Sequence, residues 1–354
     1  IIILSDANSI HTARWAKSLS EEGIHIIVFS LFSQTNRMKS FYKKNKIKIV
    51  SAKIERYGIS KYSHLFIKPL YLLALIKLKK TINSFSPDLV HAHYASSYGL
   101  LAALSNFKPY CISVWGDDVF IRKNSILIKL LLKISFKKSD KIFSTSNTID
   151  QFMLKEFKMK TTIIPFGVDT SYFKPKKNLK KLNKIGIIKS LEPYNGIKHL
   201  IDAFSLVLKK NILDIELMIV GKGSCEDELK KYVKDLNLSD SISFEGQIQH
   251  EKIVSYYNEL SLFACPSIRE SFGVSILEAS ACGLPVIANN VGGIKDLIVN
   301  GKTGYLIDTS NTDEFAKYIE NLIVDGNLIK KLGENGRNFV KNTNRKRVWK
   351  WTFM

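Results

Sequence analysis

Short apolar runs that alternate with amphipathic stretches most constrain how this chain can fold. Twelve runs of strand length occur, at residues 1–4, 24–30, 89–93, 111–115, 141–145, 162–165, 185–189, 216–221, 241–244, 262–266, 285–288 and 304–307. Most of the stretches between them have the period of an amphipathic helix. Because buried parallel strands read as continuous apolar runs, this alternation predicts an α/β chain with parallel sheets.

The number of candidate strands also predicts the domain organisation. Twelve exceed one ordinary doubly wound sheet, and a polar, basic stretch without clear period divides them six and six. We predict an open α/β domain over 1–170, a linker over 171–183 and a second such domain over 184–340. Two open domains that face each other form a cleft, and ligands bind at the carboxyl ends of parallel strands.

Composition excludes several classes of protein. Of 354 residues, 45% are hydrophobic and 24% charged, which is typical of a globular chain and not of a disordered, collagen-like or disulfide-scaffold one. Apolar stretches such as 70–76 are far shorter than the roughly 20 residues that cross a membrane. The four cysteines have no metal-like spacing, so we expect reduced thiols and a cytoplasmic location. The first residues read as a strand already begun, and we expect a short preceding piece with the initiator Met.

The positive charge is concentrated in the first half of the chain. The net charge is +21, and residues 1–170 contribute 26 Lys and Arg against 11 Asp and Glu, a net +15. Such a field attracts polyanions: nucleic acid, an anionic membrane or phosphorylated substrates. Residues 65–80 and 122–138 are basic and amphipathic, with Lys129, Lys133 and Lys137 predicted on one helix face and aliphatic residues on the other. These helices either pack their apolar face on the sheet or lie on a membrane.

The strongest chemical signal lies in residues 264–308. A strand ends at Pro266, and a helix is predicted to begin near Ser271 and to stop at Cys282, with Gly283 just beyond its end. The first-turn amides of such a helix have no intrahelical acceptors and, with the helix dipole, form an anion site suited to a diphosphate. These amides belong to Phe272, Gly273 and Val274.

A carboxylate precedes this predicted helix. Glu270 would repel phosphate, so we expect it to accept hydrogen bonds from neutral groups, and sugar hydroxyls fit that role. Glu278 follows eight residues later, about 12 Å away if the segment is helical throughout.

These residues resemble a known family. Glu270 and Glu278 match the E-x7-E signature of the retaining GT-B glycosyltransferases of family 4, also called group 1. The runs GLPVIA at 283–288, VGG at 291–293 and NGKTG at 300–304 match as well. The resemblance is strong over 185–340 and traceable through the first half, and it implies two Rossmann-like domains with 341–354 returning to the first.

The resemblance also implies residue roles, with Glu270 and Lys189 as the catalytic residues. Glu270 would contact hydroxyls of the donor sugar, the amides at 272–274 would hold its sugar and diphosphate, and Glu278 would bind the ribose hydroxyls. Gly221, in a G-x-G run after a strand, and Gly246, in an F-x-G run, match positions near the nucleotide. The loop after the first strand of the second domain, which contains Lys189, Ser190 and Asn195, would contact the donor diphosphate.

The chain departs from the family pattern at several positions. Lys189 stands where the family usually has Arg, without its bidentate geometry, and Asn195 stands where it usually has Lys. In the first domain Trp115 replaces the usual His that faces the donor sugar, whereas Asp118 keeps its place. The usual Gly-Gly turn after the first strand is replaced by residues 5–12. We expect residues 8–12 to begin a helix at the cleft that touches acceptor or donor phosphate; the predicted acceptor-side residues are Asn8, His11, His93, Trp115 and Asp118.

Two pairs of residues could suggest a metal site. Asp117-Asp118 resembles a DxD element, but that site belongs to the other glycosyltransferase fold, and the resemblance implies no metal and no cofactor. His91 and His93 could ligate zinc, yet no third ligand lies near them in sequence. We interpret this pair as structural or as part of an acceptor site.

The implied reaction transfers a sugar with retention from a nucleotide sugar, with UDP the commoner nucleotide, to an acceptor hydroxyl. Front-face attack assisted by the departing phosphate needs no general base on the protein. With the basic first half, a glycan or lipid-linked acceptor in lipopolysaccharide or capsule synthesis fits, as does peripheral contact with the inner face of the membrane. The alternatives are a GT-B nucleotide-sugar epimerase and a nucleic-acid-binding protein. A nicotinamide oxidoreductase would need G-x-G-x-x-G after the first strand, where this chain has none.

Overall fold

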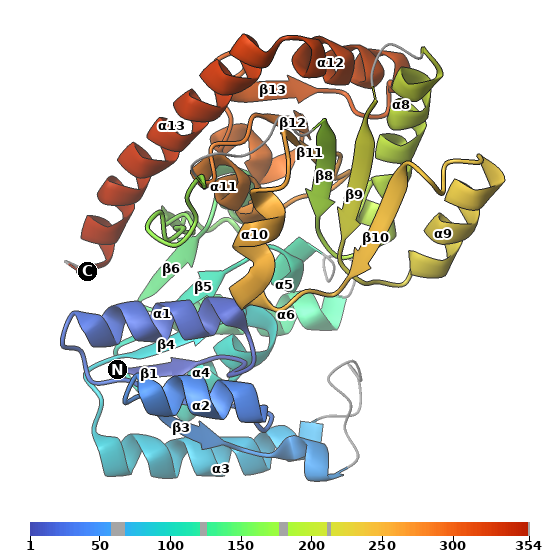
Figure 1. The fold of residues 1–354 in the computed structure, drawn as a ribbon. Helices are drawn as coiled ribbons and strands as arrows, with labels where there is room; N and C mark the ends of the chain where they lie inside the picture. Colours follow the sequence, from blue (N-terminus) through green and yellow to red (C-terminus); the bar gives the residue numbers. More distant parts are fainter. Residues whose placement is uncertain (58–67, 121–125, 177–182, 211–213, 353–354) are drawn as a thin grey trace. The chain divides into compact units, whose positions relative to one another are not determined.

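The computed structural model describes residues 1–57, 68–120, 126–176, 183–210 and 214–352 (Figure 1). The chain divides into two compact units, residues 1–164 and 165–354. Residues after 164 already belong to the second hydrophobic core, where Val168 and Phe173 are buried in one cluster with Tyr257. The unit boundary therefore precedes the predicted one at 170. The end of the predicted linker, at 177–182, lies outside the described residues, and the prediction that 341–354 returns to the first unit stays a prediction.

The first unit is a seven-stranded parallel sheet covered by helices. Its strands are β1 (Ile2–Leu4), β2 (Ile27–Ser30), β3 (Lys48–Ser51), β4 (Val90–His93), β5 (Tyr110–Val114), β6 (Lys141–Ser144) and β7 (Thr162–Ile163). Its helices are α1 (Ile10–Glu21), α2 (Asn36–Lys44), α3 (Lys68–Phe85), α4 (Leu100–Ser105), α5 (Asp117–Phe120), α6 (Ile126–Lys138) and α7 (Asn147–Phe157). Six of the strands were predicted, and β3 is an additional strand at the edge of the sheet.

Alternate residues of these strands face two helical layers. Ile2 and Leu4 of β1 belong to the core under α3, α4, α6 and α7, whereas Ile3 belongs to the core under α1 and α2. This two-sided burial explains why the strands read as continuous apolar runs rather than as alternating patterns. Among the described helices, none combines the length and hydrophobicity needed to cross a bilayer.

The second unit is a six-stranded parallel sheet. Its strands are β8 (Lys184–Ile188), β9 (Glu216–Val220), β10 (Ile242–Gly246), β11 (Leu262–Cys265), β12 (Val286–Asn289) and β13 (Gly304–Ile307). Its helices are α8 (Ile197–Lys209), α9 (Glu226–Asp235), α10 (Ile253–Tyr257), α11 (Val274–Ala281), α12 (Thr312–Val324) and α13 (Gly326–Thr352). All six strands were predicted from the sequence.

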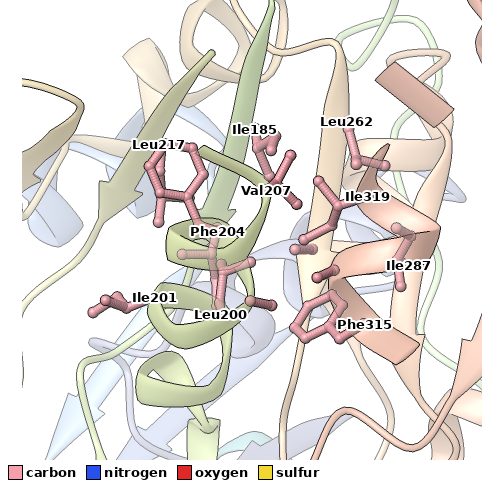
Figure 2. Close-up of a cluster of buried hydrophobic side chains, with 14 of the residues drawn as sticks. Ile185, Leu200, Ile201, Phe204, Val207, Leu217, Leu262, Ile287, Phe315 and Ile319 are labelled. Carbon is pink, nitrogen blue, oxygen red and sulfur yellow. The ribbon is translucent and has the colours of Figure 1, made fainter. Parts of the chain in front are cut away.

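The largest core of the second unit lies between this sheet and helices α8 and α12. Figure 2 shows Phe204 and Leu200 of α8 beside Phe315 and Ile319 of α12, with Ile185 and other strand residues completing the cluster. All five of these side chains are fully buried. This packing fixes the position of β8, from which the first loop of the candidate site extends.

Each sheet contains one point where the order of its strands reverses. The strand order is β3-β2-β1-β4-β5-β6-β7 in the first unit and β10-β9-β8-β11-β12-β13 in the second. Chain connections leave β1 and β8 toward one edge and return to build the other. Two loops therefore diverge at the carboxyl ends of β1 and β4, and of β8 and β11, which is where doubly wound sheets bind their ligands.

Candidate active site

The two residues predicted to be catalytic meet at the reversal point of the second sheet. Lys189 directly follows β8, and Glu270 lies in the loop after β11, the neighbouring strand. The Lys189 ammonium forms an ion pair with the Glu270 carboxylate, and both side chains are mostly buried, at 11% and 17% exposure. The topology thus brings together residues 81 positions apart in the sequence.

The surroundings of Lys189 keep it charged. Its Nζ also donates to Ser267 Oγ at 2.9 Å and to Asn195 Oδ1 at 3.4 Å. Burial alone would lower the pKa of Lys189, but the neighbouring Cys265 and the Glu270 carboxylate raise that pKa above its usual value. The site therefore presents a fixed cation at the carboxyl end of the sheet, as a diphosphate requires.

Asn195 supports this cation instead of adding a second one. Its side chain is 4% exposed, and its Nδ2 donates to the carbonyl of Ser190 at 2.7 Å and to Ser190 Oγ at 3.0 Å. With its amide oxygen on Lys189, Asn195 joins the two ends of the 189–195 loop. Asn195 and Ser190 thus hold the Lys189 loop together, and their contact with the donor stays a prediction.

Glycines allow the loops of the site to approach one another closely. A Cβ at Gly221 would overlap the carbonyl oxygen of Lys189, and a Cβ at Gly292 would overlap that of Glu270. The amide of Gly293 donates to the same Glu270 carbonyl at 3.1 Å, and the amide of Gly221 donates to the carbonyl of Gly246 at 2.9 Å. The glycine runs found in the sequence thus hold the backbone beneath Lys189 and Glu270.

The helix after Glu270 begins later than predicted. Its first residue is Val274 and its N-cap is Gly273, not Ser271. Gly273 has φ = 103° and ψ = 54°, a left-handed conformation that glycine adopts without the penalty of a Cβ. Residues 270–272 are therefore loop, and the 12 Å estimate for a continuous helix does not apply. The end was predicted correctly, because Gly283 follows the C-cap with φ = 81°.

The later start changes which amides are open at this helix. The amides of Val274 and Ser275 are now first-turn donors, which have no carbonyl four residues earlier within the helix. Phe272 is 3% exposed and its ring packs edge-on against Phe166, with centroids 5.5 Å apart. The Phe272 side chain thus anchors the 270–272 loop in the core, and Gly273 after it begins the turn into α11.

Glu278 lies in a polar network that the sequence analysis did not find. Tyr257 donates from its hydroxyl to Glu278 Oε2 at 3.1 Å, and His250 Nε2 lies 3.9 Å from Oε1. Burial, and then the Glu278 carboxylate, raise the pKa of Tyr257 well above its usual value, so it stays a donor. Glu278 itself is 6% exposed. No motif marks Tyr257, whose contact depends on how α10 meets α11.

The predicted acceptor-side residues of the first unit gather around an aromatic cluster. Trp115, after β5, lies 4.9 Å from His93 at the end of β4 and 5.8 Å from His11 in α1, between ring centroids. Trp15 completes the cluster, 5.2 Å from His93 and 5.3 Å from His91. The structure confirms the predicted helix after β1, which begins at residue 10.

His93 is at the centre of this cluster and is fully buried. Neither of its ring nitrogens has a hydrogen-bond partner. Burial, with smaller effects of His91 and His11, holds the pKa of His93 well below its usual value. His91 Nε2 pairs with Ser113 Oγ at 2.8 Å, and burial lowers its pKa to about 3. Both rings are therefore neutral, and no group of three or more His, Cys, Asp or Glu in the described residues could hold a metal ion.

Two other acceptor-side residues are bound to the backbone of their own unit. Asp118 is fully buried and accepts from the amides of Ala95 at 2.8 Å, Gly116 at 2.9 Å and Trp115 at 3.1 Å. Burial raises the pKa of Asp118 to about 6 although these amides oppose that shift. Asn8 bridges the loop after β2, donating to Ser33 and accepting from Thr35. Asp118 therefore positions the Trp115 loop, and its contact with an acceptor stays a prediction.

Family comparisons identify the chain. The model for glycosyl transferases group 1 matches residues 169–339, and the model for glycosyl transferase 4-like matches residues 1–146. Between them they span most of both units and include the Lys189 and Glu270 loops. The chain belongs to the group 1 glycosyltransferases.

Individual relatives agree with this family. An uncharacterized glycosyltransferase of Methanocaldococcus jannaschii is 29% identical over 94% of this chain and 89% of its own length. The N-acetyl-alpha-D-glucosaminyl L-malate synthase of Bacillus anthracis is 26% identical over 92% of this chain and 86% of its own. The family and these relatives make the chain a hexosyltransferase-type enzyme.

Solved structures agree on the fold. Sucrose-phosphate synthase from Thermosynechococcus elongatus aligns with a TM-score of 0.82 at 19% identity, covering 99% of this chain and 96% of that one. HepE of Anabaena, solved with UDP and glucose, aligns with a TM-score of 0.80 at 18% identity over 100% and 99% of the two chains. The two doubly wound parallel sheets are thus those of a GT-B glycosyltransferase, as the sequence predicted.

Proposed function

We propose that this group 1 glycosyltransferase moves a sugar from a nucleoside-diphosphate donor, UDP-linked as the first choice, to a hydroxyl of a glycan or lipid-linked glycan. The observation that carries the proposal is the buried Lys189–Glu270 pair at the reversal point of the second sheet. A fixed cation beside a carboxylate suits a ligand with a diphosphate at one end and sugar hydroxyls at the other.

The residues divide the work as follows. Lys189 and the first-turn amides of α11 stabilise the charge that develops on the leaving diphosphate. Glu270, freed from part of its contact with Lys189, accepts hydrogen bonds from donor-sugar hydroxyls, and Glu278 accepts those of the ribose. Gly221 and Gly246 form the backbone near the nucleotide. Asn195 stands where the family usually has a second cation, a lysine. Here its side chain instead holds Lys189, the first cation, in position.

The reaction we propose proceeds with retention of configuration. The bond between the anomeric carbon and the diphosphate oxygen breaks as the acceptor oxygen bonds to the same face of that carbon. The acceptor proton passes to the departing phosphate oxygen, so atoms and charge balance without a protein base. The protein supplies position and electrostatic stabilisation, and we expect no metal ion to be required.

The acceptor side is proposed to lie in the first unit. Trp115 and His11 are partly exposed at the carboxyl ends of its strands and present ring surfaces suited to a sugar. His93, Asp118 and Asn8 hold these loops from beneath. We further propose an acceptor in cell-surface polysaccharide synthesis at the cytoplasmic side of the membrane. In support, a relative named capsular polysaccharide biosynthesis glycosyltransferase CapM, from Staphylococcus aureus, is 32% identical over 45% of this chain.

A donor screen tests the proposal. Purified protein is incubated with a panel of labelled nucleotide sugars and bacterial lipid extract, and label in lipid and free sugar are measured. Transfer from one donor, lost in Glu270→Ala and strongly slowed in Lys189→Ala, is expected. No turnover of any donor, or full activity of Glu270→Ala, would overturn the site and favour the epimerase or nucleic-acid alternatives.

A further inference from the structure

One helical layer of the first unit has aliphatic side chains on its solvent side. Helices α3, α4 and α6 lie side by side on one face of the sheet, because α4 contacts both of the others and all three contribute to one core. We call the outer side of this layer the apolar-basic face. Its exposed residues are Leu72, Leu73, Ile76, Lys79 and Lys80 of α3, Leu104 of α4, and Ile126, Leu127, Leu130, Lys133, Ile134, Lys137 and Lys138 of α6.

The core does not use these aliphatic residues. In α6 the inward stripe is Leu132, Ser135 and Phe136, whereas Ile126 is 89% exposed and Leu130 is 55% exposed. The predicted separation of aliphatic and lysine faces in this helix was therefore wrong, because its outward face carries both. Residues 65–67 and 122–125 of the predicted basic helices lie outside the described residues.

The charge of the face is of one sign. Helices α3 and α6 contain eight lysines and no acidic residue. Lys129, at the edge of α6, pairs with Glu156 of α7 at 2.9 Å, so it contributes to the unit's own structure. Lys138 likewise donates to the Ala103 carbonyl at 3.3 Å and to Asn106 Oδ1 at 3.1 Å. Lys133 and Lys137 are exposed beside the exposed Leu130 and Ile134, which gives the face a mixture of cations and aliphatic groups.

This mixture selects among possible partners. A nucleic-acid backbone would contact the lysines but leave the aliphatic groups in unfavourable contact with polar phosphates. A second copy docked through the same face would place lysines against lysines, because a twofold interface uses the same patch on both sides. An anionic bilayer satisfies both kinds of group: aliphatic side chains enter the boundary of headgroups and acyl chains, and lysines meet lipid phosphates.

We propose that the apolar-basic face docks the first unit on the surface of an anionic lipid bilayer. This proposal rests on the proposed function, because a lipid-linked acceptor gives the enzyme a reason to bind a membrane. Binding itself, however, does not require catalysis. The bilayer would then hold the acceptor near the carboxyl ends of the same unit's strands.

Vesicle flotation of the full chain tests the proposal. The probes are vesicles of phosphatidylcholine with phosphatidylglycerol, and of phosphatidylcholine alone. We expect binding to the anionic vesicles only, weakened by salt because lysine–phosphate attraction is screened. Leu130→Glu with Ile134→Glu is expected to weaken partitioning at least about tenfold, because it removes aliphatic burial and adds anionic charge. Val324→Glu, at an exposed aliphatic residue of α12, is the control.

A second pair of variants separates charge from hydrophobicity. Lys133→Gln with Lys137→Gln is expected to reduce binding to anionic vesicles, whereas Lys330→Gln with Lys331→Gln, at exposed lysines of α13, leaves it unchanged. Equal binding by face and control variants would overturn the proposal. Absence of vesicle binding would overturn it as well. One form of that outcome is a wild-type protein that does not bind vesicles but is a dimer, which the α6 variants turn into a monomer.

The same proteins are assayed for turnover of a nucleotide sugar in detergent. Vesicle binding without turnover contradicts the proposed function and leaves the docking surface standing. Turnover without vesicle binding contradicts the docking surface alone.

Discussion

At the scale of single residues, the proposed donor site depends on a buried ammonium that stays charged. Lys189 has three side-chain oxygens around its Nζ, those of Glu270, Ser267 and Asn195. Removing one partner of a buried ion pair leaves an uncompensated charge, which costs about 3–5 kcal/mol of stability. Variants of this pair therefore need a folding control before their activities are compared.

Asn195 offers a milder test of the same cluster. Asn195→Ala removes the amide oxygen from Lys189 and the two donations to Ser190, so we expect kcat to fall about tenfold while KM for the donor changes less. Steady-state kinetics with matched thermal unfolding curves measure this. The control is Asn183→Ala in the same unit, whose side chain donates to the carbonyl of Asp214 just before β8, at the opposite end of that strand from Lys189. An unchanged kcat in Asn195→Ala would show that Lys189 needs no such support.

The buried histidines predict a loss of stability in acid. His91, with a pKa of about 3, and His93 stay neutral in the folded state, whereas unfolded histidines take up protons below about pH 6.5. The free energy of unfolding is therefore nearly independent of these two histidines above about pH 6.5, and it falls as the pH drops below that value. Asp118, whose pKa is raised to about 6, has the opposite slope between about pH 4 and 6, since its folded form keeps a proton longer.

His93→Leu isolates the contribution of one ring. Between pH 7.5 and 5.0 the free energy of unfolding should fall by about 2 kcal/mol less in this variant than in wild type. The reason is that one fewer histidine takes up a proton when the chain unfolds. Denaturant unfolding followed by fluorescence at the two pH values measures the difference, and Asp118 cancels because it is present in both proteins. His25→Leu, at an exposed histidine of the same unit, is the control. Identical pH dependence in His93→Leu and wild type would contradict the account.

At the scale of elements, loops packed on loops place the catalytic groups. Glycines let the VGG run reach the carbonyl of Glu270 and let the turn after β9 reach that of Lys189. The sequence indicated these glycines as motif positions, but not which backbone each one approaches. That information depends on which strands are neighbours in the sheet.

Gly292→Ala tests this arrangement without touching a reacting group. The new Cβ would overlap the Glu270 carbonyl, so the loop must move, and we expect transfer to slow at least about a hundredfold. Gly301→Ala is the matched control, because its φ is likewise positive, at 73°, but a Cβ there meets no atom within 4 Å. The control should show only backbone strain of roughly 1 kcal/mol in thermal unfolding. Equal transfer rates in the two variants would contradict the account.

Prediction from sequence worked best for strands that are buried on both faces of the sheet. Most of the twelve predicted strands, such as β1 and β11, are buried on both faces, which makes their runs continuously apolar. Strand β3 was missed, since it lies at the edge and begins with the exposed Lys48. The start of α11 was placed too early, because Ser271 fits an N-cap pattern that the left-handed Gly273 overrides.

At the scale of the whole molecule, the two units have the same design and different chemistry. Each places its polar groups where its strand order reverses, an ion pair in the second unit and an aromatic cluster in the first. The E-x7-E spacing was enough to select Glu270 and Glu278 as candidate site residues, and the loop after β8 was enough to select Lys189. Contacts between elements distant in sequence, such as Tyr257 with Glu278, leave no local pattern and could not be predicted.

The charge arrangement predicts catalysis without a divalent cation. In the proposed function, Lys189 and the amides at the start of α11 hold the leaving diphosphate without a metal ion. Transfer measured after dialysis against EDTA should equal the untreated rate. Loss of transfer that added Mn²⁺ or Mg²⁺ restores would contradict this expectation.

The most direct test of the central claim compares two ion pairs of the second unit. Lys189–Glu270 is the buried pair of the site, and Lys184–Glu216, at 2.9 Å, is a more exposed pair on the same sheet. With the donor found in the screen, kcat/KM for transfer is measured for Lys189→Met and Lys184→Met. We expect a loss of at least about a hundredfold for Lys189→Met, because the leaving diphosphate loses its fixed cation, and an unchanged value for Lys184→Met. Equal kcat/KM values in a folded Lys189→Met would contradict the claim that this pair is the centre of the enzyme's donor site.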